Sequence, residues 1–398
     1  MQKTIMFQRP LYSKIRERLI LERKFIQVLM GPRQVGKTTI VRQLLEKYSF
    51  PWHYASADEA TQPLWLQQQW ETIRLKAHSA ESSEALLVID EIQKIPDWSN
   101  QVKIQWDKDS FDKFPVKLIL LGSSQLMLQK GLSESLAGRF EVINIPHWSF
   151  NEMHDAFGFT ANDFIWFGGY PGPADLISDE SRWKDYIRYS LIETTLMRDI
   201  LLMVRIDKPV LLRNLFDLAC SFSGQILSYN KILGQLKDAG NTTTLAHYLR
   251  LLEGAGMIKG LEKYSPSTIR QRASSPKFQV FNMALMSALS PNPRKEITGQ
   301  PEIYGRWVES AIGAHLLNLC ITGQVNIYYW REGNHEIDFV LQKGNKTIGI
   351  EVKSGRNKLS TGIPAFSRHF NPTKILLVGR EGIPVEEFFT IPVANLFI

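Results

Sequence analysis

Short apolar runs alternate with segments of helical spacing over the first 150 residues of the chain. The runs that have the length and composition of β-strands are residues 25–30, 52–56, 85–90, 116–122 and 140–145. The third and fourth runs are apolar almost throughout, as expected for strands that are buried on both faces. The segment after Lys37 repeats apolar residues at helical intervals. This alternation predicts an α/β fold with a parallel sheet, and Pro146 marks its end.

The remainder of the chain changes its pattern twice. Residues 147–207 are mostly helical, with a break at the turn FGGYPGP. Residues 208–290 predict helices followed by short strands. After the segment SPNPRK, the pattern predicts a helix over 305–317 and strands over 325–330, 336–341 and 347–352. We therefore expect four regions, 1–146, 147–207, 208–290 and 291–398, of which the second is a helical lid or linker and the last is a second α/β domain.

Length and composition narrow the class of protein. A chain of 398 residues is too long for one core, and 44% hydrophobic with 22% charged residues is ordinary for a globular protein. The two cysteines, Cys220 and Cys320, lie in apolar stretches and fit neither a disulfide framework nor a zinc site. No apolar run is long enough to span a bilayer, and the first residues lack a signal-peptide pattern. We therefore expect a cytoplasmic location and no membrane partner.

Residues 31–38, GPRQVGKT, match the P-loop pattern and lie between a predicted strand and a predicted helix. The backbone N–H groups of such a loop surround the β-phosphate of a nucleotide, and the helix adds its positive N-terminal end. Lys37 is predicted to reach the β- and γ-phosphates, and the Thr38 hydroxyl is predicted to bind Mg²⁺. The predicted nucleotide-binding residues are Gly31, Pro32, Arg33, Gln34, Val35, Gly36, Lys37, Thr38 and Thr39.

The run LLVIDE at 86–91 supplies the second half of a nucleotide site. Its four apolar residues place Asp90 at the carboxyl end of a buried strand, beside the P-loop, where the carboxylate can hold Mg²⁺ through water. The adjacent Glu91 can act as the general base that polarises the attacking water. Together the two motifs predict an enzyme that binds ATP and Mg²⁺ and releases ADP.

Four segments, GPRQVGKTT (31–39), VIDEIQ (88–93), GSS (122–124) and LAGR (136–139), resemble a prokaryotic family of AAA-type ATPases. The resemblance implies that Ser123 or Ser124 is the sensor-1 group facing the γ-phosphate, although AAA proteins commonly have Asn or Thr there. It also implies that Arg139 is an arginine finger. A finger acts across a subunit boundary and therefore implies a homo-oligomer, either a ring or a dimer. The alternative for Arg139 is an ordinary surface salt bridge.

Residues 221–290 carry most of the excess positive charge, with eight Lys or Arg against three Asp or Glu in a chain of net charge +7. The segments 225–236, 241–254 and 256–261 have the rhythm of a winged helix, with Asn241 or Thr242 as the N-cap of the second helix. In a DNA-binding winged helix, the residues predicted to face the groove or the phosphates are Thr242, Thr243, His247, Arg250, Arg270 and Arg272. The alternative is a lid or a protein-contact module, as winged helices in AAA-type proteins often are.

The last region contains a second candidate site. Asp338 is followed, after twelve residues, by Glu351 and by Lys353 two positions later, which is the layout of restriction-endonuclease-like nucleases. Two carboxylates on adjacent strands hold Mg²⁺ in such enzymes, and the lysine orients the hydroxide or stabilises the phosphate. Glu309, on the preceding helix, is a possible additional ligand.

The segments YGRWVES, YYWREGNHEIDFVL and IGIEVKSG also resemble the tail domain of the same ATPase family. The resemblance implies a nuclease-like fold that either cleaves nucleic acid or serves only as a binding platform. Three hypotheses follow for the whole chain. It is an ATP-driven enzyme that processes DNA, a nucleotide-switched regulatory or signalling protein that does not cleave, or an ATP-dependent remodeller of a protein partner.

Overall fold

A computed structural model describes the chain at residues 7–60, 62, 64–122, 132, 135–201, 206–236, 241–267, 271, 274–323, 325–353 and 361–398, without the side chains of 198 and 199. The structure divides into two compact units, Met1–Ile145 and Pro146–Ile398. This division lies one residue before the predicted end of the first region. The predicted divisions after residues 207 and 290 both fall inside the second unit and stay predictions.

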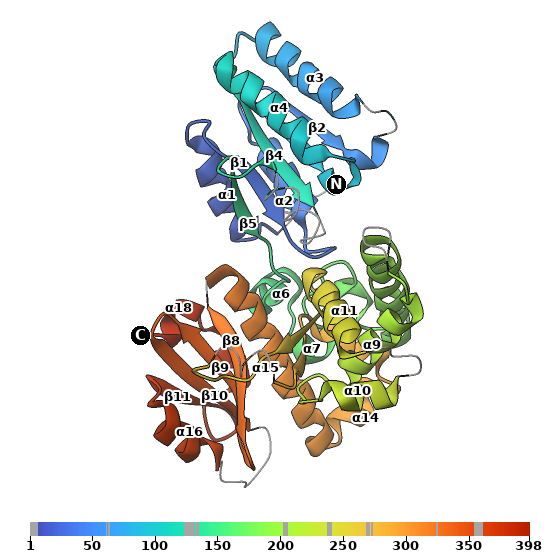
Figure 1. The fold of residues 1–398 in the computed structure, drawn as a ribbon, viewed down its shortest axis with the longest axis vertical. Coiled ribbons are helices and arrows are strands. Elements are labelled where there is room, and N and C mark those ends of the chain that lie inside the picture. The colour runs from blue at the N-terminus through green and yellow to red at the C-terminus, as the bar shows by residue number, and fades with distance from the viewer. Residues whose placement is uncertain are drawn as a thin grey trace. The chain divides into compact units, whose positions relative to one another are not determined.

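The first unit is built on a five-stranded sheet with the strand order β2-β3-β4-β1-β5 (Figure 1). All four pairings between neighbouring strands are parallel, as the sequence predicted. The strands are β1 (Ile26–Met30), β2 (Trp52–Ser56), β3 (Ala85–Asp90), β4 (Val116–Gly122) and β5 (Phe140–Asn144). The helices are α1 (Leu11–Ile20), α2 (Lys37–Leu45), α3 (Trp65–Ser79) and α4 (Trp98–Phe111), with single 3₁₀ turns at Ala57–Glu59 and Ile92–Lys94.

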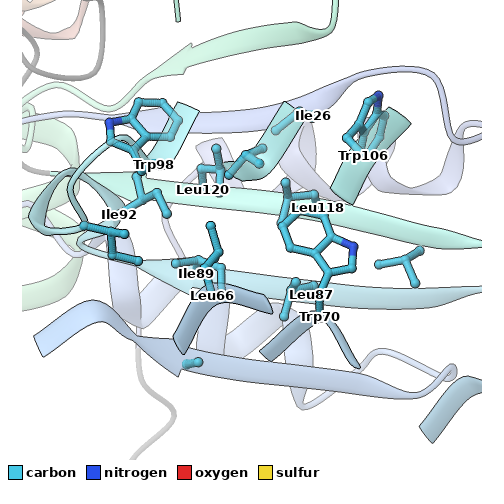
Figure 2. Packing of buried hydrophobic residues seen from close by; sticks show 14 of the residues in the cluster. Ile26, Leu66, Trp70, Leu87, Ile89, Ile92, Trp98, Trp106, Leu118 and Leu120 are labelled. Atoms are coloured by element: carbon cyan, nitrogen blue, oxygen red, sulfur yellow. The ribbon is translucent and has the colours of Figure 1, made fainter. Parts of the chain in front are cut away.

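Each face of this sheet has its own core. Figure 2 shows the face that α3 and α4 cover, where indole rings pack on aliphatic side chains from the strands. Trp70 of α3 and Trp106 of α4 contribute to it, together with Leu87 and Leu118 of the strands. The opposite face packs against α1 and α2. β3 and β4 are buried along their whole length, which explains the mainly apolar runs that predicted them.

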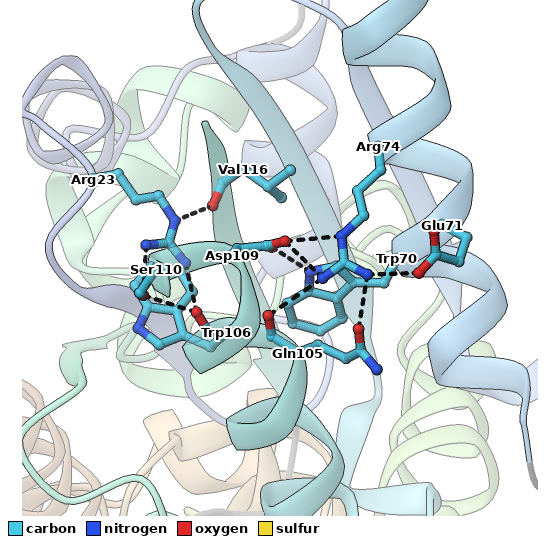
Figure 3. Close-up of polar contacts among 9 residues, drawn as sticks. All are labelled: Arg23, Trp70, Glu71, Arg74, Gln105, Trp106, Asp109, Ser110 and Val116. Atoms are coloured by element: carbon cyan, nitrogen blue, oxygen red, sulfur yellow. Dashed lines mark hydrogen bonds and ion pairs between the residues drawn. The ribbon is translucent and has the colours of Figure 1, made fainter. Parts of the chain in front are cut away.

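A buried carboxylate joins the helices on the first of these faces (Figure 3). Asp109 of α4 is 1% exposed and accepts hydrogen bonds from Trp70 Nε1 at 2.7 Å and from Arg74 Nε and Nη2 at 2.8 and 2.6 Å. Nearby, the Arg23 guanidinium donates to the Val116 carbonyl at 2.6 Å and lies over the indole of Trp106. Charged groups therefore fix α3 and α4 relative to the sheet, at the edge where strands β1 and β4 begin.

The second unit starts with helices, which a mixed sheet and three further helices follow. Its helices before the sheet are α6 (Phe150–Phe157), α7 (Ala161–Phe167), α8 (Glu180–Asp185), α9 (Pro209–Ser221), α10 (Tyr229–Gln235), α11 (Thr242–Gly254), α13 (Met283–Leu289), α14 (Arg294–Thr298) and α15 (Pro301–Gly323). A 3₁₀ turn spans Ala174–Leu176, and the helix continuing α8 is wound as π-helix over Tyr186–Glu193 and Thr195–Ile200. The FGGYPGP segment separates α7 from the 3₁₀ turn, as predicted.

Two sheets belong to this unit. Strands β6 (Ile258–Leu261) and β7 (Lys277–Val280) form an antiparallel pair that follows α10 and α11. The larger sheet has the order β11-β10-β9-β8, with bounds β8 (Asn326–Glu332), β9 (His335–Lys343), β10 (Lys346–Lys353) and β11 (Lys374–Gly379). The remaining helices are α16 (Gly362–Phe370), α17 (Val385–Thr390) and α18 (Val393–Leu396). Strand β11, which the sequence did not predict, pairs parallel with β10, whereas the other neighbours are antiparallel.

Both cysteines are buried and free, as expected for residues inside apolar stretches. In the described part of the chain, every helix falls short of the length and hydropathy that a membrane span requires.

Candidate functional site

The P-loop lies between β1 and α2, at the carboxyl edge of the first sheet. Two of its residues, Gln34 (φ 57°) and Gly36 (φ 88°), have left-handed backbone conformations, which turn the chain sharply before the helix. Gly31 has no room for a side chain, because a Cβ there would lie 2.2 Å from the carbonyl oxygen of Ile145. The turn and the close approach explain why glycines stand at both ends of the loop.

The side chains of Lys37 and Thr38 lie at this loop, where the sequence predicted them. The Lys37 ammonium is buried and donates to the carbonyl oxygens of Gly31 and Pro32 at 2.9 and 2.7 Å. The Thr38 hydroxyl donates to Asp90 Oδ2 at 2.8 Å, so the two motifs meet across 52 positions of the chain. A hydroxyl and a carboxylate side by side are hard oxygen donors, which is the donor set that Mg²⁺ prefers.

Tyr54, in the middle of β2, is a further partner of Asp90. Its hydroxyl donates to Asp90 Oδ2 at 2.6 Å, and the backbone N–H of Glu91 donates to Oδ1 at 2.9 Å. Burial and this hydrogen bond raise the pKa of Tyr54 above its ordinary value. The phenol therefore stays protonated and holds the carboxylate in place beside Thr38.

Glu91 follows Asp90 in a left-handed conformation with φ 53°. For a residue with a Cβ this conformation costs about 1 kcal/mol or more, so the surrounding structure must hold it. The side-chain amide of Gln93 donates to Glu91 Oε2. The left-handed conformation ends the strand directly after Asp90, and a 3₁₀ turn follows at Ile92–Lys94.

The other predicted residues of the nucleotide site are placed less completely. Ser123 and Ser124 lie outside the described residues. Arg139 directly precedes β5, which runs parallel to β1. It therefore lies at the amino edge of the sheet, whereas the P-loop of the same chain follows β1 at the carboxyl edge. Its guanidinium forms an ion pair with Asp107 of the same chain, at 2.8 Å (Nε–Oδ1) and 3.0 Å (Nη2–Oδ2). The finger role stays a prediction.

Helix α11 presents the predicted groove-facing residues on its surface. Thr242, Thr243, His247 and Arg250 are all exposed, whereas the opposite side of the helix is buried through Leu245, Tyr248, Leu249 and Leu252. Of the two predicted N-cap residues, Asn241 is the one that caps the helix, since its side chain accepts from the Thr244 N–H at 2.9 Å. Arg270 and Arg272 lie outside the described residues.

The carboxylates of the predicted nuclease site lie close together in the last sheet. Asp338 of β9 and Glu351 of β10 are the next residues beyond the registered pair Phe339–Ile350 of these antiparallel strands. Asp338 Oδ2 accepts from the Val352 N–H at 2.7 Å. Lys353 Nζ lies 2.7 Å from Glu351 Oε1. Glu309 of α15 approaches the same cluster, where burial raises its pKa to about 7, against the opposing effect of a neighbouring ammonium.

That ammonium belongs to Lys277 of β7, which the sequence analysis did not select. Its Nζ lies 2.7 Å from Glu309 Oε1, 3.6 Å from Glu336 Oε1 and 3.7 Å from Asp338 Oδ1. Within the described ranges, no three His, Cys, Asp or Glu side chains are arranged to hold a metal ion. A metal site formed by Glu309, Asp338 and Glu351 therefore stays a prediction. The Lys277 ammonium already lies against two of these carboxylates, those of Glu309 and Asp338.

Several residues of these sites were missed from the sequence. Besides Tyr54 and Lys277, the buried guanidinium of Arg9 donates from Nη1 to the Val35 carbonyl of the P-loop at 2.8 Å. Only Tyr54 has a local signal, because it stands two positions before the end of a strand that leads to the same edge as the P-loop. Arg9 and Lys277 make contacts over 26 and 61 positions of the chain and carry no motif.

Three family models match consecutive segments of the chain. Residues 23–154 match an AAA domain. Residues 159–296 match a domain of unknown function (DUF8612), and residues 304–395 match another (DUF4143). The chain thus contains an AAA-type P-loop domain, followed by helical and mixed-sheet regions. Domains of the AAA type typically bind ATP together with Mg²⁺.

Similar proteins come from bacteria and archaea. The uncharacterized protein Rv2008c of Mycobacterium tuberculosis is 28% identical over 361 residues, which are 89% of this chain and 74% of that protein. The uncharacterized protein MJ1544 of Methanocaldococcus jannaschii is 24% identical over 344 residues, which are 81% of this chain and 73% of that protein. Among solved structures, a RuvB variant of Thermotoga maritima is 16% identical, covers 64% of this chain and 86% of its own, and gives a TM-score of 0.34.

Proposed function

We propose that the first unit binds Mg-ATP and hydrolyses it to ADP and phosphate. The observation that carries the proposal is the 2.8 Å contact between the Thr38 hydroxyl and Asp90, directly beside the P-loop. This contact brings the two halves of a magnesium-nucleotide site together at one edge of a parallel sheet, which is the edge where ligands bind in such folds. The match of residues 23–154 to an AAA domain supports the same conclusion.

Each residue has a part in this proposal. The Lys37 ammonium, which now donates to the carbonyls of Gly31 and Pro32, exchanges these oxygens for phosphate oxygens when ATP binds. Thr38 and Asp90 hold Mg²⁺, which neutralises charge on the β- and γ-phosphates. Glu91 accepts the proton of the water that attacks the γ-phosphorus, and the bond to the β-γ bridging oxygen breaks.

Glu91→Gln separates binding from chemistry. The amide keeps the size of the side chain but cannot accept the proton, so we expect nucleotide affinity close to that of the wild type and loss of turnover. The matched control is Glu59→Gln, an exposed carboxylate in the turn after β2. Unchanged hydrolysis by the Glu91→Gln protein would remove Glu91 from the mechanism, and loss of turnover in the control would point to a nonspecific effect.

We retain Ser123 or Ser124 as the sensor and Arg139 as a finger acting on the site of a second copy. The in-chain pair of Arg139 with Asp107 is no obstacle, since both side chains are about one-third or more exposed and such pairs contribute at most about 1 kcal/mol. Arg139→Ala chains alone should lose ATP turnover, because no chain supplies a finger to its neighbour. In mixtures with wild-type chains, the ATP sites of the Arg139→Ala chains should regain turnover, because a wild-type neighbour supplies the finger. Absence of rescue would assign Arg139 to the surface pair.

We further propose that α11 contacts DNA. The four predicted groove residues share one exposed face, and the basic excess of residues 221–290 surrounds them in sequence. Arg250→Ala should weaken binding of duplex DNA and reduce its salt dependence by about one counterion. The control is Lys259→Ala, whose ammonium is already paired with Glu253 at 2.7 Å. A salt slope unchanged by Arg250→Ala would favour a lid or a protein contact.

The proposal does not extend to cleavage of DNA. Of the three hypotheses, the position of Lys277 favours a nucleotide-switched protein whose tail binds without cutting. Measuring the rate of ATP hydrolysis with and without duplex DNA tests whether DNA contact affects ATP turnover. Stimulation by DNA would connect the two sites, and the same rate in both conditions would favour a protein partner.

A further inference from the structure

Lys277 is a fully buried lysine in a strand. All four residues of β7 are buried, and the Lys277 side chain is 0% exposed. Lysine is seldom completely buried unless its charge is paired. The register fixes the side chain in this position, because Lys277 pairs with Leu261 of β6 on one side and forms a bridge with Ile226 on the other.

The surroundings of the ammonium are those of a bound cation. Carboxylates of Glu309, Glu336 and Asp338 lie within 3.7 Å of Nζ, and the backbone carbonyl of Asp338 accepts from Nζ at 3.2 Å. The ring of Phe339 lies 4.9 Å from the same nitrogen. The ammonium therefore has oxygen ligands from two elements, α15 and β9.

The same oxygens would be needed by a divalent ion. Asp338 Oδ2 accepts from the Val352 N–H, while Oδ1 and Glu309 Oε1 face Lys277. Glu351 Oε1 is paired with Lys353. A magnesium ion placed between Asp338 and Glu309 would stand next to the positive charge of the buried Lys277 ammonium, which repels it. The residues present thus do not fit the metal that a nuclease of this layout requires.

We propose that Lys277 is the resident cation of this cluster and keeps the nuclease-like tail free of divalent metal. A lysine cannot reproduce the chemistry of the ion, since an ammonium has no open coordination position for a water or a phosphate oxygen. The tail retains the carboxylates because Lys277 compensates their repulsion. It is then a folded binding platform rather than a phosphodiesterase. This inference does not depend on the ATP site.

Manganese binding to the full-length chain tests the proposal, with electron paramagnetic resonance as the readout for bound Mn²⁺. The chain carries Asp90→Asn throughout, so that the nucleotide site contributes no metal, and contains no nucleotide. We expect no bound Mn²⁺ in this parent. Lys277→Met removes the charge but keeps the length of an unbranched side chain, and we expect it to gain one Mn²⁺ site. Adding Asp338→Asn should abolish that gain.

The matched control is Lys259→Met, on the neighbouring strand β6, which should stay metal-free like the parent. Lys277→Arg preserves the charge and should also stay metal-free. Mn²⁺ bound by the parent and lost with Asp338→Asn would overturn the proposal, as would DNA cleavage with the same dependence. These two measurements test the proposal even if the Lys277→Met chain fails to fold. A folded Lys277→Met chain without a Mn²⁺ site would equally contradict it.

Discussion

The buried carboxylate of Asp109 gives the most direct estimate of what stabilises the first unit. Asp109→Ala leaves the Arg74 guanidinium, whose side chain is 10% exposed, without its main counter-charge. Removing one member of a buried ion pair costs about 3 to 5 kcal/mol. Arg74 keeps Glu71 at 2.6 Å and Gln105 at 2.9 Å, so the lower end applies. The indole N–H of Trp70 also loses its acceptor, which adds about 1 kcal/mol.

The sum is about 4 kcal/mol, which corresponds to about a thousandfold change in the opening equilibrium of the unit. Hydrogen exchange of the amides in β3 and β4 measures this equilibrium for the first unit alone, whereas denaturation would mix the transitions of both units. We expect these amides to exchange about a thousandfold faster in Asp109→Ala. In the double variant Arg74→Met/Asp109→Leu the acceleration should be smaller, because no charge is left unpaired. Acceleration below about tenfold in Asp109→Ala would refute the reasoning, since it would mean that Arg74 regains water at little cost.

Two further predictions concern other parts of the molecule. Gly31→Ala should destabilise the first unit by about 1 to 3 kcal/mol and weaken ATP binding, because its Cβ would meet the Ile145 carbonyl. The control Gly234→Ala has open space around its Cβ and should change neither stability nor affinity when ATP is titrated against both variants. Burial lowers the pKa of His315 to about 4, whereas the unfolded chain titrates near 6.5. The unfolded state therefore binds the proton first, and stability present above about pH 6.5 is lost as the pH falls toward 4, by up to about 3 kcal/mol. His315→Leu should flatten this part of the stability–pH profile, and an unchanged slope would show that His315 is protonated in the folded state as easily as in the unfolded one.

Much of the first unit could be predicted from its sequence because the relevant signals are local. A strand buried on both faces is a continuous apolar run, so β3 and β4 were predicted with the bounds that the structure has. The edge strand β2 has an exposed first residue and a weaker pattern, and its predicted bounds of 52–56 also agree with the structure. The convergence of Thr38 and Asp90 also followed, because the carboxyl ends of parallel strands share one edge of the sheet.

The acidic cluster shows where such reasoning ends. The spacing of Asp338, Glu351 and Lys353 predicted their proximity, which needs only a hairpin of two adjacent strands. Lys277 joins the cluster from a strand 61 positions before Asp338, through tertiary packing that no periodicity encodes. Its sequence context, a lysine at the start of a short strand, is that of an ordinary surface residue. The sequence left both cleavage and binding without cleavage open for the tail, and the missed contact is the observation on which we propose the second.

The central claim is that residues 31–38 and Asp90 form a working nucleotide site. Equilibrium titration of Mg-ATP against the wild-type chain and Lys37→Ala tests it most directly, with Lys47→Ala, an exposed lysine just beyond α2, as the control. We predict one saturable ATP site in the wild type and in the control, and loss of measurable binding in Lys37→Ala. Equal affinity of the wild type and Lys37→Ala would contradict the account, because the Lys37 ammonium would then make no contact with the phosphates.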